Sequence, residues 1–227
     1  MKKSSFTSLF LLAFSVCTFS SLHAQIDLSG VLWDQDEIIC KEQERATTHF
    51  QQPSYRNQFA GLTDIHYQTM AWEIDPAVKY IKGVITYYFR SRTNNLTQFV
   101  LDMSNALVVN SIERNGVALS YAHSADQLLT IDLDKTLNED DFDTLTVSYE
   151  GTPPSNGFGS FETGTHAGVP ILWTLSEPYG NRDWWPGKQD LIDKIDSMDI
   201  YITTPPGQLA ASNGKLISID EVGGKLV

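Results

Sequence analysis

The sequence predicts an all-β fold, built mainly of antiparallel strands in a sandwich or a saddle-shaped sheet. From about residue 64 onward, apolar residues alternate with polar ones, so that Met70, Trp72 and Ile74 would share one face of a strand. Similar short segments recur at roughly ten-residue spacing, and no helical pattern separates them. We therefore expect strands that each bury one face.

The expected strands are bounded by turn-forming residues. They are expected near residues 70–75, 85–90, 99–103, 107–112, 129–133, 145–149, 171–175, 199–203 and 216–221, with a short last one at 225–227. Asn115-Gly116 predicts a two-residue hairpin turn, because both central positions of that turn need a positive φ. Residues 151–170 contain five of the 15 glycines and three of the nine prolines, which predicts a long, irregular loop.

Residues 1–24 have the pattern of a secretory signal peptide. Lys2 and Lys3 give it a basic start, an apolar run follows from Leu9 to Phe19, and Ala24 supplies a small residue at the expected cleavage site. A bilayer span needs about 20 apolar residues, more than this run contains. We expect an exported protein that is periplasmic, held at the cell surface or extracellular, and that has no membrane span.

The mature chain is expected to have two parts. Residues 25–62 are polar and include a short N-terminal helix expected from Asp34 to His49, whereas residues 63–227 form the β domain. Val222-Gly223-Gly224 predicts a turn into a return strand, and a hairpin that stops soon after its turn leaves an open edge. We therefore expect the natural protein to extend beyond Val227.

The charge balance of the chain is acidic. It carries 16 Lys+Arg against 28 Asp+Glu, a formal net charge of -12 at pH 7. Nucleic acid is therefore not an expected partner, because affinity for phosphate comes from clustered Lys and Arg. Of the two cysteines, Cys17 falls in the signal segment, so Cys40 has no partner for a disulfide within the chain and is assigned no role.

Recognisable catalytic motifs are missing from the sequence. None of the five histidines begins an H-E-x-x-H pattern, and neither a G-x-S-x-G elbow nor a dinucleotide-binding fingerprint occurs. Aspartates at positions 190, 193, 196 and 199 lack the Gly and Glu that a calcium-binding EF-hand loop needs. We expect no catalytic residue and no metal ligand within these 227 residues.

The most distinctive segment spans residues 173–190 and holds three of the five tryptophans. Glu177-Pro178 and Arg182 match one stretch of a motif of the aminopeptidase N family of zinc metallopeptidases. Trp185-Pro186 and Gln189-Asp190 match the turn that follows in that motif. The segment therefore resembles this family.

The resemblance extends over about residues 64–227 and implies the saddle-shaped N-terminal β domain of a secreted zinc aminopeptidase. It implies that Glu177 binds the α-amino group of a peptide substrate. From the residues themselves, Arg182 and Asp183 are expected to form a structural ion pair that holds the loop, in preference to a direct substrate contact. Trp185 and Pro186 are also expected to give structural support. Zinc, its ligands and the general base would belong to the protein's own downstream catalytic domain beyond Val227, where zinc activates water. The 227-residue chain alone is therefore expected to be inactive.

Two positions depart from the family pattern. Glu177 stands where Gln is common, and a carboxylate is a stronger partner for an ammonium group. Gly187 stands where Cys is common, a difference that we expect to matter little.

Three other readings of the segment stay open. Glu177 could only shape a turn. Trp184 and Trp185 could form a sugar-stacking platform on a non-catalytic binding module, although burial is the commoner use of tryptophan. The domain could also be an inactive peptidase-like scaffold that serves interactions with other proteins.

Overall fold

The computed structural model describes residues 57–227 except 156–159, 177–178 and 191–192. The chain divides into two units, Met1–Gln35 and Asp36–Val227, and all described residues belong to the second. The expected signal peptide, Cys40 and the helix expected at 34–49 lie outside the described residues.

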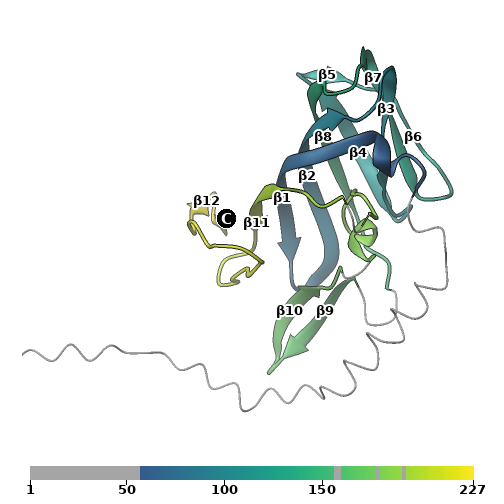
Figure 1. Ribbon diagram of the computed structural model, residues 1–227. Coiled ribbons are helices and arrows are strands. Elements are labelled where there is room, and N and C mark those ends of the chain that lie inside the picture. Colours follow the sequence, from purple (N-terminus) through teal and green to yellow (C-terminus); the bar gives the residue numbers. More distant parts are fainter. Residues whose placement is uncertain (1–56, 156–159, 177–178, 191–192) are drawn as a thin grey trace, which may run out of the picture. The chain divides into compact units, whose positions relative to one another are not determined.

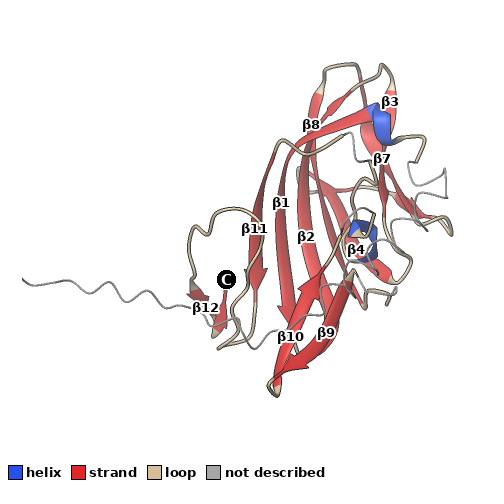
Figure 2. Cartoon of the chain, turned by 60° about the horizontal axis from the view of Figure 1, so that its bottom comes forward, coloured by secondary structure: helices blue, strands red, loops and turns tan. Residues whose placement is uncertain are grey.

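Strands and their connections make up most of the described chain (Figures 1 and 2). The larger sheet has the strand order β11-β1-β2-β8-β4-β5. Its strands are β1 (Thr63–Asp75), β2 (Val78–Ser91), β4 (Leu107–Arg114), β5 (Val117–Ala118), β8 (Phe142–Gly151) and β11 (Ser197–Thr203). All neighbours in this sheet are antiparallel except β1 and β11, which run parallel.

A smaller sheet has the order β3-β7-β6, and two hairpins complete the strands. These elements are β3 (Leu96–Asp102), β6 (Tyr121–His123), β7 (Leu128–Leu137), β9 (Phe161–His166), β10 (Val169–Thr174), β12 (Glu221–Val222) and β13 (Lys225–Leu226). The helical elements among the described residues are two single 3-10 turns, η1 (Ala60–Leu62) and η2 (Asn181–Asp183). The expected all-β, mainly antiparallel, sandwich-like fold is confirmed.

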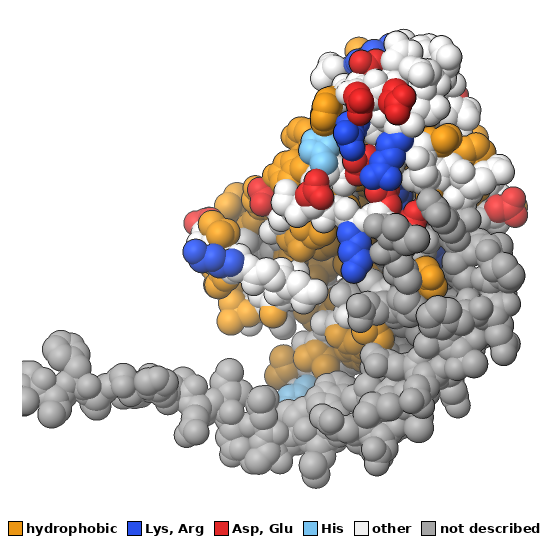
Figure 3. Space-filling model, in the orientation of Figure 1, with side chains coloured by type: hydrophobic (Ala, Val, Ile, Leu, Met, Phe, Trp, Pro, Cys, Tyr) orange, Lys and Arg blue, Asp and Glu red, His pale blue; other side chains and the backbone are white. Residues whose placement is uncertain are grey.

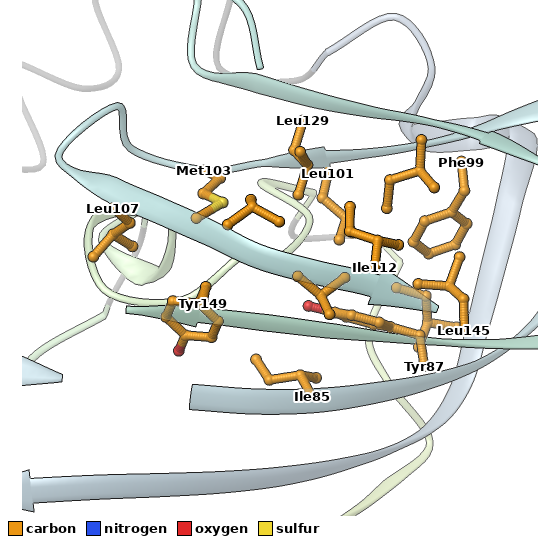
Figure 4. Close-up of a cluster of buried hydrophobic side chains, with 14 of the residues drawn as sticks. Ile85, Tyr87, Phe99, Leu101, Met103, Leu107, Ile112, Leu129, Leu145 and Tyr149 are labelled. Atoms are coloured by element: carbon orange, nitrogen blue, oxygen red, sulfur yellow. The ribbon is translucent and has the colours of Figure 1, made fainter. Parts of the chain in front are cut away.

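One hydrophobic cluster joins the inner faces of the two sheets (Figure 4). Tyr87 and Leu145 of the larger sheet and Phe99, Leu101 and Leu129 of the smaller sheet are fully or almost fully buried within it. Each large apolar side chain that is fully buried contributes about 1.5–3 kcal/mol to folding. The alternation of apolar residues in the sequence therefore marked the inner faces of the strands correctly.

Two predicted turns are confirmed by their backbone angles. Asn115 and Gly116 have φ values of 51° and 78°, and they join β4 to β5. Gly223 and Gly224 have φ values of 60° and 79°, and they join β12 to β13. Both turns need a left-handed backbone conformation at their two central positions. Asn-Gly and Gly-Gly are pairs that adopt this conformation readily.

Two predictions about local structure were wrong. The irregular loop expected over 151–170 ends at Ser160, because β9 and β10 form a hairpin around Ala167-Gly168, both with positive φ. Pro170 is tolerated in β10 because that strand lies at the edge of a two-stranded sheet. The strand expected at 216–221 is also missing, since pairing begins only at Glu221, where β12 starts.

The connection from β10 to β11 carries the distinctive tryptophan-rich segment. The chain leaves the hairpin at Thr174, passes through η2 and returns to the larger sheet at Ser197, beside β1. This crossover brings residues 184–189 against strands that are far away in the sequence.

Candidate functional site

Trp184 anchors the segment in the hydrophobic core. Its side chain is only 7% exposed, and its ring centroid lies 4.8 Å from that of Trp72 on β1. The ring centroid of Phe161, at the start of β9, lies 6.0 Å from that of Trp184. Because the Trp184 ring is buried among these aromatics, it cannot serve as an exposed platform for a sugar.

A buried tyrosine hydroxyl links Trp184 to the sheet. The indole Nε1–H of Trp72 donates to the Tyr149 hydroxyl at 3.0 Å, and that hydroxyl donates to the Trp184 carbonyl at 3.0 Å. Gly83 on β2 is paired with Tyr149 on β8. Because glycine has no Cβ, it leaves room for the Tyr149 ring, with which a Cβ at position 83 would overlap. Burial raises the pKa of Tyr149, so its hydroxyl keeps the proton that it donates.

A second buried tyrosine holds the next turn of the segment. The Tyr87 hydroxyl on β2 donates to the carbonyl of Pro186, and both residues are buried. Burial also raises the pKa of Tyr87 well above its ordinary value. Two hydroxyls from neighbouring strands thus fix the backbone at positions 184 and 186.

Asp102, at the end of β3, holds residues 187–189. Its backbone forms a two-way bridge with Gly187, with N···O distances of 2.7 and 3.0 Å. Its carboxylate accepts the Gln189 backbone N–H at 3.1 Å and the Asn57 side-chain amide at 2.8 Å. Burial raises the pKa of Asp102, and these hydrogen bonds oppose the rise. The segment is thereby tied to the smaller sheet as well.

Gly187 is closely packed against neighbouring side chains. A Cβ at this position would lie 2.6 Å from ring carbon Cζ3 of Trp185 and 2.6 Å from the Asn181 side-chain amide. Side chains essentially never come so close, so a larger residue would displace Trp185. The half-buried Trp185 ring also meets Trp184 edge to face at 6.3 Å.

Ion pairs hold the far end of the segment. The Lys188 ammonium donates to the Asp193 carboxylate and to the Thr63 carbonyl, and burial lowers its pKa. Arg92 reaches Asp193 and Asp64, each at 3.2 Å. Acidic and basic side chains lie side by side on the face shown in Figure 3. The carboxylates of Asp64 and Asp193 therefore serve ion pairs at this end of the segment.

Arg182 and Asp183 both hold the η2 turn in place. The Ser160 hydroxyl, fully buried, donates to Asp183 Oδ2 at 2.6 Å. The Arg182 carbonyl accepts the Ser104 backbone N–H at 2.9 Å. These contacts agree with a supporting role, whereas the expected ion pair between the two side chains stays a prediction.

Glu177 and Pro178 lie outside the described residues, but the residues on both sides are fixed. The Gly180 N–H donates to the Ser176 carbonyl at 2.7 Å, and the Ser176 hydroxyl accepts the Trp184 indole N–H at 3.1 Å. The Tyr179 carbonyl accepts the Gln189 side-chain amide at 3.0 Å. The role of Glu177 itself stays a prediction.

The sequence did not predict four of the residues that anchor the segment: Tyr87, Tyr149, Asp102 and Ser160. They lie on other strands or connections, and the tyrosines look like ordinary inward-facing strand residues. The only available signal was Asp102, an acidic residue directly after the apolar run 99–101.

Among the described residues, no group of three or more His, Cys, Asp or Glu side chains is placed to hold a metal ion. Within the described ranges, no helix is long and apolar enough to cross a membrane.

The chain resembles solved structures, although no protein-family model matches it and no curated protein matches its sequence. A mutant of a two-domain M1 zinc metallopeptidase bound to L-arginine has 22% identity and a TM-score of 0.65, covering 77% of this chain and 39% of that one. A mutant M1 zinc metallopeptidase from Deinococcus radiodurans, bound to a Tyr-Ser-Ala substrate, has 23% identity and a TM-score of 0.64 over the same shares. Another structure of an M1 zinc metallopeptidase from Deinococcus radiodurans has 23% identity and a TM-score of 0.62, covering 72% of this chain and 37% of that one.

The chain thus spans 39% of the length of the first two of these structures. At such identities the likeness concerns the fold. It agrees with the sequence motif of residues 177–190. The chain therefore has the fold of an aminopeptidase N-type N-terminal domain, as found in M1 zinc metallopeptidases.

Proposed function

We propose that this chain is the substrate-positioning N-terminal domain of an exported zinc aminopeptidase, which removes N-terminal residues from peptides. In this proposal Glu177 binds the free α-amino group of the substrate. The zinc ion, which activates water, is held by a downstream catalytic domain of the same protein. Because the amino group is fixed, only the first peptide bond reaches the metal.

The observation that carries the proposal is the anchoring of the segment around Glu177. Ser176, Tyr179 and Gly180 are each hydrogen-bonded to other parts of the segment, and residues 184–189 are bonded to four strands. A binding group gains affinity and selectivity when its support is rigid before the ligand arrives. The structural relatives are described as binding L-arginine and a Tyr-Ser-Ala substrate, both of which carry an α-amino group.

The carbohydrate-binding alternative loses the support of Trp184, whereas Trp185 is half-buried. Trp184 is buried, and its indole N–H is already bonded to Ser176. A sugar could reach neither face of this ring without unfolding the segment.

The proposal is tested on the natural protein with its proposed zinc domain. Glu177→Ala removes a hydrogen bond to a charged group, which is worth about 1.5–3 kcal/mol. We expect kcat/KM for an aminoacyl p-nitroanilide to fall roughly 10- to 100-fold in this variant. In Glu177→Gln we expect a smaller fall in kcat/KM. Glu221→Gln on the exposed strand β12 is the matched control and should change nothing.

Two results would contradict the proposal. One is a loss of less than threefold for Glu177→Ala, which would leave Glu177 as a turn residue. The other is zinc-dependent hydrolysis of the same substrate by residues 25–227 alone, which would place the chemistry in this chain.

A further inference from the structure

The outer face of the larger sheet, opposite the core, carries an ordered set of side chains. A β-bulge between Ile65 and Tyr67 breaks the alternation of β1, so that Ile65 and Gln68 point inward and the two residues between them point outward. The strand register then defines three rows across β11, β1, β2 and β8. The rows are Ser197, Tyr67, Tyr88 and Thr144; Asp199, Thr69, Thr86 and Thr146; and Tyr201, Ala71, Val84 and Ser148.

Aromatic side chains are gathered on this face. Tyr67 and Tyr88 lie opposite each other with ring centroids 5.1 Å apart, and His66 meets Phe142 edge to face at 5.3 Å. Phe142 is 63% exposed and Tyr201 is 50% exposed. Tyr67 and Tyr88 are half-buried beside them. A single exposed aromatic is ordinary, whereas a contiguous exposed apolar patch is typical of a binding surface.

One of these rings is held in place before any ligand arrives. The Tyr67 hydroxyl donates to Asp199 Oδ2 at 2.8 Å, across the parallel pair β1 and β11. This hydrogen bond raises the pKa of Tyr67 to about 12. A ring fixed by such a bond loses little freedom when a ligand stacks on it.

Between the aromatic row and Tyr201 lies a row of polar groups. Asp199, Thr69, Thr86 and Thr146 supply one carboxylate and three hydroxyls, and the hydroxyls of Thr86 and Thr146 are 2.9 Å apart. A protein partner with an apolar centre would bury these groups without hydrogen bonds, at about 1–3 kcal/mol each. A polyanion would be repelled by Asp199 in a chain of net charge -12.

We propose that this outer face binds a neutral carbohydrate chain. The C–H faces of its rings would stack on Tyr67 and Tyr88, and its hydroxyls would bond to the row of Asp199, Thr69 and Thr86. Aromatic faces carry partial negative charge and attract such C–H groups. This site lies on the side of β1 opposite Trp72 and Trp184, so it is independent of the proposed peptidase role.

The test titrates the 227-residue chain with soluble neutral hexasaccharides of β-1,4-glucose, β-1,3-glucose and β-1,4-N-acetylglucosamine, followed by calorimetry. We expect at least one to bind with a Kd on the order of 0.01–1 mM. Tyr88→Ala should weaken that binding at least tenfold. Tyr67→Phe, which keeps the ring but removes its tether to Asp199, should weaken it roughly threefold or more.

Tyr121→Ala is the matched control, since Tyr121 is 42% exposed but lies on β6 of the other sheet. It should leave binding unchanged, and circular dichroism should show that all variants fold. The proposal is overturned if no hexasaccharide binds with a Kd below about 10 mM, or if Tyr121→Ala weakens binding as much as Tyr88→Ala. It is also overturned if wild-type protein dimerises in sedimentation and Tyr88→Ala dissociates the dimer, because the face would then be a protein contact.

Discussion

Replacing Tyr149 by Phe should destabilise the domain through one missing oxygen atom. The hydroxyl accepts from the Trp72 indole and donates to the Trp184 carbonyl, and it is fully buried. Its removal leaves one buried donor and one buried acceptor without a partner, and each such group costs about 1–3 kcal/mol. Allowing for some relaxation, we expect a loss of about 3 kcal/mol in the free energy of unfolding.

The loss is measured by urea unfolding and by calorimetry. For a domain of this size, about 3 kcal/mol corresponds to a fall of roughly 6–12 °C in Tm. Amide hydrogen exchange adds a local readout, since protection should fall most at Trp184 and Trp185, beside the freed carbonyl.

Tyr121→Phe is the control for the loss of a tyrosine hydroxyl. Tyr121 is 42% exposed, and its hydroxyl makes only a long contact of 3.4 Å with the Val109 carbonyl, so its removal should change stability by less than about 0.5 kcal/mol. If Tyr149→Phe also costs less than about 0.5 kcal/mol, the hydroxyl does not hold the segment and our account of its anchoring is wrong.

Two further predictions concern the same segment. Gly187→Cys should destabilise the domain by about 1–3 kcal/mol in urea unfolding, because the new Cβ overlaps Trp185 and Asn181; an unchanged midpoint would show that the ring moves freely. Burial raises the pKa of Asp102 above its ordinary value of 3.8, so the folded state holds this proton more tightly than the unfolded state does. The contribution of the protonated carboxyl to the free energy of unfolding is therefore fully present below pH 3.8 and is lost as the pH rises through the folded pKa. Asp102→Asn should therefore gain stability relative to wild type as pH rises above 3.8, and parallel pH profiles in urea unfolding would contradict this assignment.

Local patterns in the sequence were enough for most of the sheet. The alternation around Met70 and Trp72 reflects burial of one strand face, and Asn115-Gly116 reflects a steric preference within the turn itself. The glycine and proline content of residues 151–170 led to the wrong prediction of an irregular loop. Pro170 is compatible with a strand there because β10 is an edge strand. Residues 216–220 have strand-like alternation but no strand, since alternation describes one face and does not supply a neighbouring strand to pair with.

The candidate segment was located by its unusual composition, but its support could not be predicted. Tyr149 lies 35 residues before Trp184, and Tyr87 lies 99 residues before Pro186. Which buried tyrosine reaches which carbonyl depends on the crossover that follows β10 and on the room left by Gly83. Neither is visible in a local pattern of residues.

These long separations set an order for folding. Lys188 is bonded to Thr63, 125 residues earlier, and Gln189 to Asp102, 87 residues earlier. Closing such long loops is entropically unfavourable until their targets are already in place. During synthesis the segment emerges after β1, β2, β3 and β8, and it can dock only on the sheets that they form. A chain whose sheets are incomplete therefore lacks the groups that hold residues 184–189, so these residues reach their final conformation only after β1, β2, β3 and β8 have formed.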